Sequence, residues 1–191
     1  MTMKNLLITI VCVMLGTAAM AQTEHLKFKG IPMDCSVDEM ARKLQAKGFK
    51  YEDKLDGTVF MKGSFAGTYD CLIGLIPIEG GTKIRRIGVI FPNCGNWECL
   101  ENKYNYLKDM LTQKYTRPHS IEKFDSYSEP TNNGNKMTLV QLDRCKYQSD
   151  FNINNGSIML FIKNGFDAHI VLVYEDAANA KVNDQNVLDD L

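Results

Sequence analysis

The chain has 191 residues, of which 22 are Lys or Arg and 23 are Asp or Glu, so its formal net charge at pH 7 is −1. This balance argues against nucleic acid and anionic membrane surfaces as partners, because both select a larger positive footprint than the short cluster around Arg85 and Arg86. Hydrophobic residues make up 45% of the chain, enough to bury a core without help from a metal or disulfides.

The first 21 residues have the three regions of a secretory signal peptide. Lys4 supplies the positive charge, residues 6–15 are almost all apolar, and residues 19–21 form a small-x-small cleavage site. The apolar run is about half as long as a membrane-spanning helix, so we expect no stable membrane insertion after cleavage. Cys12 is preceded by valine rather than the small residue of a lipobox, which makes lipidation the weaker alternative. We therefore expect an exported protein, periplasmic or secreted.

The mature chain begins with a short strand-like alternation at 26–30, followed by a helix. Ser36 and Glu39 form the S-x-x-E capping box that begins a helix. The apolar residues that follow recur at offsets 0, 3, 4 and 7, as on one face of a helix: Val37, Met40, Ala41 and Leu44. Gly48 is placed to end this helix.

Three strand-like segments follow at 58–61, 68–78 and 82–91. The polar stretch before them, with Asp53 and Asp56, is interpreted as a solvated turn. In the third segment one face is apolar, whereas the other is mixed: Ile84, Arg86, Gly88 and Ile90.

The pattern then restarts. Asn96 is a good N-cap for a second, longer helix that stops at Pro118. Its apolar residues again follow helical spacing: Trp97, Leu100, Tyr104, Leu107, Met110 and Leu111. The later segments are a strand at 121–127, a loop at 129–135, a strand or irregular stretch at 136–142, a meander of strands at 146–153, 157–163 and 168–174, and a frayed tail or loose helix after 175.

This order predicts an α+β fold made of two tandem helix-plus-antiparallel-meander units packed together. The predicted divisions are 1–21 for the signal peptide, 22–91 for the first unit, 92–175 for the second unit, and 176–191 for a polar acidic tail.

Two stretches carry a family resemblance. Residues 30–49 and 97–115 resemble the corresponding parts of small exported bacterial proteins of unknown function. The repeated helix and meander is also similar, in topology only, to the β-lactamase-inhibitor-protein-like and outer-membrane-assembly-lipoprotein-like folds. That second resemblance implies a fold that elsewhere binds other proteins through its sheet face and loops. The first transfers no catalytic residues, because none are established for those proteins.

Five cysteines follow residue 21, and export would place them where disulfides persist. Cys94 and Cys99 are close enough to pair around a turn, and Cys71 and Cys145 could join the two halves. Fifteen arrangements of two bridges are open, and a set of buried free thiols is an equal alternative.

No catalytic grouping, cofactor motif or metal-ligand spacing stands out in the sequence. The three histidines, His25, His119 and His169, are far apart. We therefore expect no catalytic, cofactor or metal residues. Aromatic side chains are the candidate interface instead: Phe65 and Tyr69 surround the first hairpin bend, and Tyr106 lies off the apolar stripe of the second helix.

The favoured hypothesis is a non-catalytic protein-binding or adaptor module of the bacterial cell envelope, whose partner is another envelope or secreted protein. Two alternatives stay open: an exported hydrolase whose site assembles only in space, and a small-ligand carrier. A cleft with a histidine beside a carboxylate or thiol would favour the hydrolase. An enclosed apolar cavity would favour the carrier.

Overall fold

The computed structural model describes residues 24–189, so the predicted signal peptide lies outside the described residues. Four helices and ten strands follow one another in this part of the chain. In chain order they are β1 (Lys27–Phe28), β2 (Ile31–Pro32), α2 (Val37–Gln45), β3 (Lys50–Leu55), β4 (Thr58–Phe65), β5 (Thr68–Pro77), β6 (Ile84–Ile90), α3 (Trp97–Lys114), β7 (His119–Phe124), α4 (Asn133–Gln141), β8 (Cys145–Ile153), β9 (Gly156–Lys163), β10 (His169–Asp176) and α5 (Ala177–Asp189).

Eight of the strands form one antiparallel sheet in the order β3-β4-β5-β6-β10-β9-β8-β7. Helix α2 precedes the meander β3–β6, and α3 precedes the strands β7–β10, with α4 inserted between β7 and β8. The last strands of the two runs, β6 and β10, pair at the centre, where Val89 lies opposite Leu172. The fold is therefore α+β, as predicted, while a tandem duplication stays a prediction.

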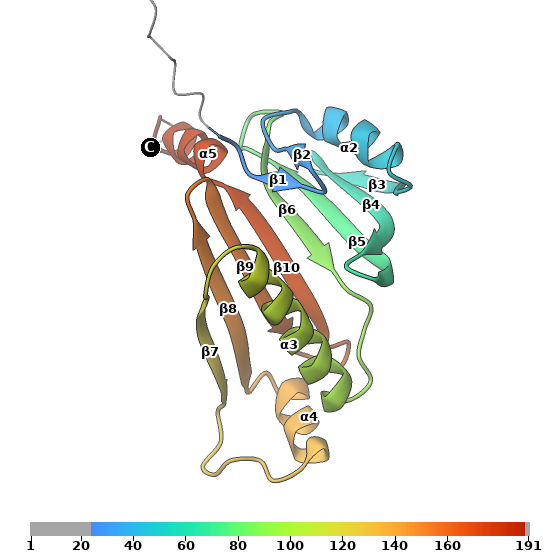
Figure 1. Ribbon diagram of the computed structural model, residues 1–191, viewed down its shortest axis with the longest axis vertical. Helices are drawn as coiled ribbons and strands as arrows, with labels where there is room; N and C mark the ends of the chain where they lie inside the picture. The colour runs from blue at the N-terminus through green and yellow to red at the C-terminus, as the bar shows by residue number, and fades with distance from the viewer. Residues whose placement is uncertain (1–23, 190–191) are drawn as a thin grey trace, which may run out of the picture.

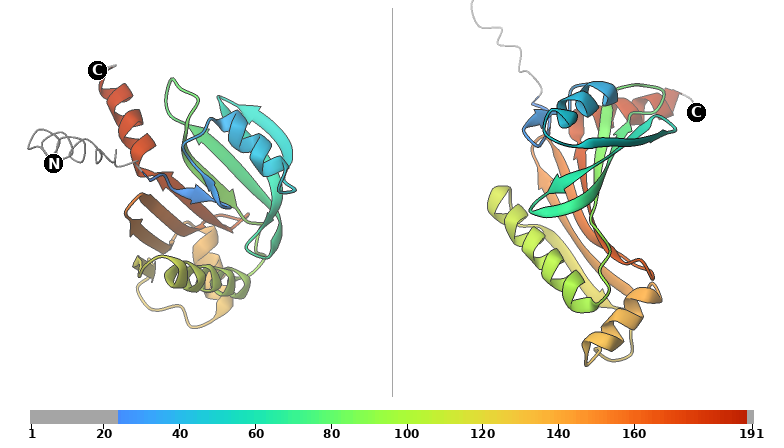
Figure 2. Two further views of the ribbon diagram at one scale, coloured as in Figure 1. Left: turned by 45° about the horizontal axis from the view of Figure 1, so that its top comes forward. Right: turned by 90° about the vertical axis from the view of Figure 1, so that its right-hand side faces the viewer.

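Helices α2 and α3 lie on the same side of the sheet, as Figure 1 and the right-hand view of Figure 2 show. Strand residues that face them are buried, because the two helices cover this side with their apolar stripes. Cross-strand register places Ile73, Val89, Leu172 and Leu160 in one row on this side. The core is thus a single layer between two helices and one face of the sheet.

The two predicted helix starts are confirmed. Ser36 Oγ accepts a hydrogen bond from the Glu39 amide at 3.2 Å, and Asn96 Oδ1 accepts one from the Cys99 amide at 2.9 Å. These side chains satisfy amides that the first turn of a helix leaves without an intrahelical partner. Trp97 and Tyr104, both predicted on the apolar stripe of α3, are fully buried.

Two local predictions were wrong. The polar turn predicted around Asp53 is strand β3, an edge strand whose six side chains are all exposed, so it has no hydrophobic alternation to detect. The segment predicted as the end of a loop and then strand or irregular is helix α4. Asn132 caps this helix by accepting from the Asn135 amide at 2.9 Å, and Val140 is its one buried residue.

The tail-or-helix alternative after residue 175 is resolved as helix α5, which docks through amide side chains rather than apolar ones. Asn179 is buried and donates to the carbonyls of Met33 and Ile84, both at 2.8 Å. One turn further along, Asn183 accepts from the Glu79 amide at 2.8 Å. Helix α5 is therefore attached to the backbone of the first half of the chain.

Candidate functional site

The side of the sheet opposite α2 and α3 has no helix laid across it in the described part of the chain (Figure 2). We call this side the open face. Its side chains are the alternate residues of each strand, and its centre is apolar and partly exposed rather than polar: Phe60, Leu72, Ile76, Ile90, Met159, Phe161, Val171 and Val173. An antiparallel sheet with one solvated face normally has polar residues there, so this composition is unusual.

Two glycines lie side by side at the centre of the open face, and we call the unfilled space over Gly88 the depression. Gly74 and Gly88 are directly opposite each other on β5 and β6, and Val173 lies opposite Gly88 on β10. The Phe60 ring covers Gly74, since a Cβ there would be 3.6 Å from it, whereas a Cβ on Gly88 would meet no heavy atom within 4 Å. Neither glycine has a positive φ. Backbone conformation and crowding therefore do not require glycine at position 88.

An apolar row runs beside this depression. Leu72, Ile90, Val171 and Phe161 are successive cross-strand neighbours on β5, β6, β10 and β9. On the other side of the depression, Ile76 lies opposite Arg86. The depression is therefore bordered by apolar side chains along one side and by an aliphatic and a charged side chain along the other.

A pocket of about 490 Å³ lies at the end of the open face nearest α5, and its lining includes Ile76, Arg85, Arg86 and Asn183. Both arginines use Nε to bind the same carboxylate oxygen of Glu175, at 3.1 and 2.8 Å. This shared acceptor holds the two guanidinium groups in place beside the pocket.

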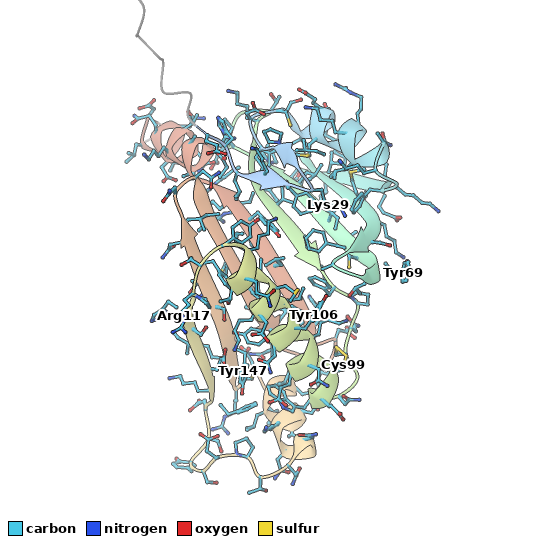
Figure 3. The ribbon with its side chains drawn as sticks, viewed as in Figure 1. Lys29, Tyr69, Cys99, Tyr106, Arg117 and Tyr147 are labelled. Atoms are coloured by element: carbon cyan, nitrogen blue, oxygen red, sulfur yellow. A yellow bond between two sulfur atoms is a disulfide. The ribbon has the colours of Figure 1, made fainter. Side chains whose placement is uncertain are left out.

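The three predicted interface aromatics occupy different places. Figure 3 labels two of them: Tyr69 lies near the hairpin joining β4 and β5, and Tyr106 lies on α3. Both are exposed, at 77% and 54%. Phe65 instead stacks on Phe28 at 5.4 Å between ring centroids and packs against Phe91, so it is half-buried against the core. The structure does not bring the three side chains into one surface.

The cysteines divide into one bonded pair and three thiols. Cys94 and Cys99 are joined by a disulfide that spans the start of α3. Cys71 and Cys145 are free and buried, so the predicted bridge between the halves is wrong. Strands β5 and β8 are separated by β6, β10 and β9, about 19 Å at the usual strand spacing and far beyond disulfide reach.

Burial raises the pKa of all three free thiols. The pKa of Cys145 is raised to about 12 by burial, and those of Cys35 and Cys71 are raised for the same reason. The thiolate is the nucleophilic form of cysteine, so these residues are structural in character. This arrangement gives no support to a thiol-dependent hydrolase.

Two histidines lie beside carboxylates, and both carboxylates are occupied. His119 lies directly opposite Asp150, which accepts hydrogen bonds from Gln148, and within the described residues only His25 comes within 4.0 Å of a carboxylate. His25 Nδ1 is 3.0 Å from Asp176 Oδ1, but the same carboxylate also accepts from the amides of Leu26 at 2.8 Å and Asn179 at 2.9 Å. The hydrogen bonds of His25 reach no hydroxyl or thiol within the described residues. His169 contacts the backbone oxygen of Asp167 at 2.7 Å. No three potential metal ligands gather anywhere in residues 24–189.

A polar network that is buried at one end lies between α3 and the β7–β8 edge. Tyr104 Oη is 2.6 Å from Ser149 Oγ and donates to Glu122 Oε1 at 3.2 Å, and Lys108 Nζ donates to the same oxygen at 2.7 Å. Burial raises the pKa of Tyr104, and it raises the pKa of Tyr147 to about 12. These shifts favour the neutral phenols and lead to a prediction about alkaline stability.

We expect the free energy of unfolding to fall steeply between about pH 9 and pH 12. The unfolded chain loses protons from tyrosine near pH 10 and from cysteine near pH 9, whereas Tyr147 and Cys145 hold theirs to about 12 when folded. Their contribution is therefore complete below pH 9 and is lost as the pH rises through the folded values. Urea titrations at pH 8, 10 and 11 measure this, with tyrosinate absorbance as a second readout. Tyr147→Phe should make the free energy of unfolding depend less on pH. If the free energy of unfolding of the unsubstituted protein does not change with pH, the raised pKa values of Tyr147 and Cys145 are contradicted.

Comparisons of the chain with protein-family models, with curated proteins and with solved structures found no match. Among the described helices, none combines the length and apolar character needed to cross a membrane.

One sequence pattern predicts part of the open face, whereas the rest of the face has no local signal. The mixed side of the 82–91 segment, with Arg86, Gly88 and Ile90, is part of this face. Its extension across β10 and β9 follows from the pairing of β6 with β10, which joins residues about 80 positions apart. No local pattern indicates that pairing.

Proposed function

We propose that this chain is a non-catalytic protein-binding module that docks its partner on the open face. The observation that carries this proposal is the apolar, glycine-indented centre of a sheet face that no described helix covers. Large apolar surfaces exposed on one face are typical of protein interaction sites. We expect the partner to be an envelope or secreted protein, because the first 21 residues have the pattern of a signal peptide.

Gly88 gives a second reason to propose the open face as the docking surface. Glycine within a strand costs stability, because it loses more backbone freedom on folding and contributes no side chain to packing. Position 88 is open, and the backbone conformation there suits any residue. A partner side chain that approaches the backbone at this point would account for the glycine, since a larger residue would fill the space.

Site-specific photocross-linking tests the proposal. We would place benzoylphenylalanine at Phe161, on the open face, in residues 22–191 and illuminate the folded protein with solubilised envelope and culture proteins. The matched control places the same group at Tyr106, which is on the helix side and 54% exposed. We expect one stoichiometric adduct, identified by mass spectrometry, from position 161 alone.

Three outcomes would contradict the proposal. The first is an adduct from position 106 with none from position 161, which would move the interface to the helices. The second is the absence of an adduct from position 161 when circular dichroism shows that the variants labelled at positions 161 and 106 are both folded. An adduct from both positions with different proteins would also count against a single docking face.

A further inference from the structure

A row of basic side chains crosses one end of the open face. Lys123 lies directly opposite Lys146 on β7 and β8, and Lys163 lies directly opposite His169 on β9 and β10. All four side chains are on the open face, because each alternates with a neighbour that faces the helices, and the three lysines are exposed. We call these four residues the basic row.

The basic row lacks compensating charge. Within the described residues, none of the three lysines has a carboxylate within 4.0 Å. The nearby acidic groups have other partners. Asp150 accepts from Gln148 at 2.9 Å and Asp143 accepts from Asn164 at 2.9 Å, while Asp125 lies 3.9 Å from Arg144 and Asp167 accepts from Asn93 at 3.3 Å. Like charges directly opposite on neighbouring strands destabilise a sheet. The Lys123–Lys146 pair is therefore a local cost to the stability of the sheet.

The basic row adjoins the apolar row. Lys163 and Phe161 are two residues apart on β9, so they point to the same side, and Lys123 has the same relation to Ile121 on β7. A ligand that covers both rows needs apolar groups beside negative charges. This combination fits an acidic, amphipathic protein segment. A nucleic acid or an anionic lipid surface would select a larger basic footprint than a chain of formal net charge −1 provides.

We infer that the partner of the open face is a protein segment in which apolar side chains adjoin a cluster of carboxylates. Its carboxylates bind the basic row, and its apolar side chains cover the row from Leu72 to Phe161. This inference rests on the proposed function and adds the chemistry of the partner to it. Binding would also relieve the repulsion between Lys123 and Lys146.

The probe is a fluorescein-labelled 12-residue peptide whose first half contains Leu and Phe and whose second half contains Glu and Asp. Its counterpart has Lys in place of the acidic residues. By fluorescence anisotropy, we expect residues 22–191 to bind the acidic peptide at least ten-fold more tightly than the basic one. The preference should shrink at high ionic strength, because exposed charges are screened over about 10 Å at 0.1 M salt.

Charge reversal locates the effect. The triple variant Lys123→Glu, Lys146→Glu and Lys163→Glu should lose the preference for the acidic peptide or reverse it. A control variant reverses three exposed lysines on or beside α2, α3 and α5, with the same change in net charge, and should retain the preference: Lys47→Glu, Lys114→Glu and Lys181→Glu.

The single variant Lys146→Glu gives a readout that does not need the partner. Replacing a like-charged cross-strand pair with an opposite-charged one should raise Tm by about 1–3 °C. The same substitution should weaken binding of the acidic peptide by at least three-fold. A lower Tm would show that the two lysines do not repel each other across the strands.

Equal affinities for the two peptides, or no measurable binding of either, would overturn the inference. Comparable binding of single-stranded DNA or phosphatidylglycerol vesicles, lost in the triple variant, would replace the protein segment with a general polyanion. If cross-linking from Phe161 succeeds while the charge reversals have no effect on it, the proposed function stands and the acidic partner is wrong.

Discussion

Replacing Asp176 with alanine should lower the free energy of unfolding by about 3 kcal/mol. The carboxylate is fully buried, and it accepts hydrogen bonds from the amides of Leu26 and Asn179 and contacts His25. Removing it leaves two buried amides unsatisfied, and hydrogen bonds to a charged group are worth about 1.5–3 kcal/mol each. The loss should appear in urea unfolding at pH 7 followed by circular dichroism.

The matched control is Asp184→Ala on α5, the helix that directly follows Asp176. Asp184 is exposed and lies 3.8 Å from Arg85 Nη2, so we expect a change of less than about 0.5 kcal/mol. Hydrogen exchange adds a local readout, because Asp176→Ala should speed exchange of the Leu26 amide before the sheet opens. Equal losses for both variants would mean that Asp176 does not hold the first strand and α5 together.

Replacing Gly88 with valine should make the fold more stable while weakening partner binding at least ten-fold. Valine suits a strand better than glycine by as much as about 1 kcal/mol, and its Cβ meets no heavy atom within 4 Å. The same side chain fills the depression at the centre of the open face. Thermal unfolding measures the first effect, and cross-linking yield from benzoylphenylalanine at Phe161 measures the second.

Gly95→Val is the control for this experiment. Gly95 is also free of neighbours within 4 Å and of a positive φ, but it lies between the two disulfide cysteines and outside the open face. It should leave the cross-linking yield unchanged. If Gly88→Val also leaves that yield unchanged, the depression is not part of the docking surface. If Gly88→Val lowers the stability of the fold, position 88 requires glycine for a structural reason that the packing around it does not show.

The sequence best predicts the helices and strands whose buried residues recur in a regular pattern. Helices α2 and α3 have a capping residue followed by an apolar stripe, and strands β9 and β10 are apolar runs bounded by turns. Strand β3 has no buried residue, and α4 buries only Val140 behind a segment rich in turn formers. In these two elements the tertiary context decides the structure, and local preference does not indicate it.

The candidate site was harder to predict than the fold, because it depends on strand order. Lys123 and Lys146 are far apart in the sequence and unremarkable there, yet pairing of β7 with β8 makes them neighbours. Gly74 and Gly88 become adjacent only through pairing of β5 with β6. The sequence analysis instead predicts an interface at the aromatic residues Phe65, Tyr69 and Tyr106. The structure does not bring these three side chains together.

The central pairing of β6 with β10 also has a consequence for how the chain reaches its folded state. Until β10 has been synthesised, β6 is an unpaired edge with free backbone amides and carbonyls, although its own hairpin partner β5 is already present. Such an edge can recruit strands from other molecules. Closure of the sheet joins segments about 80 residues apart, and contacts of such long range slow folding. Misassembly is therefore most favoured while β6 is still unpaired with β10. Variants that weaken β10 should aggregate during refolding even when their native state is still stable.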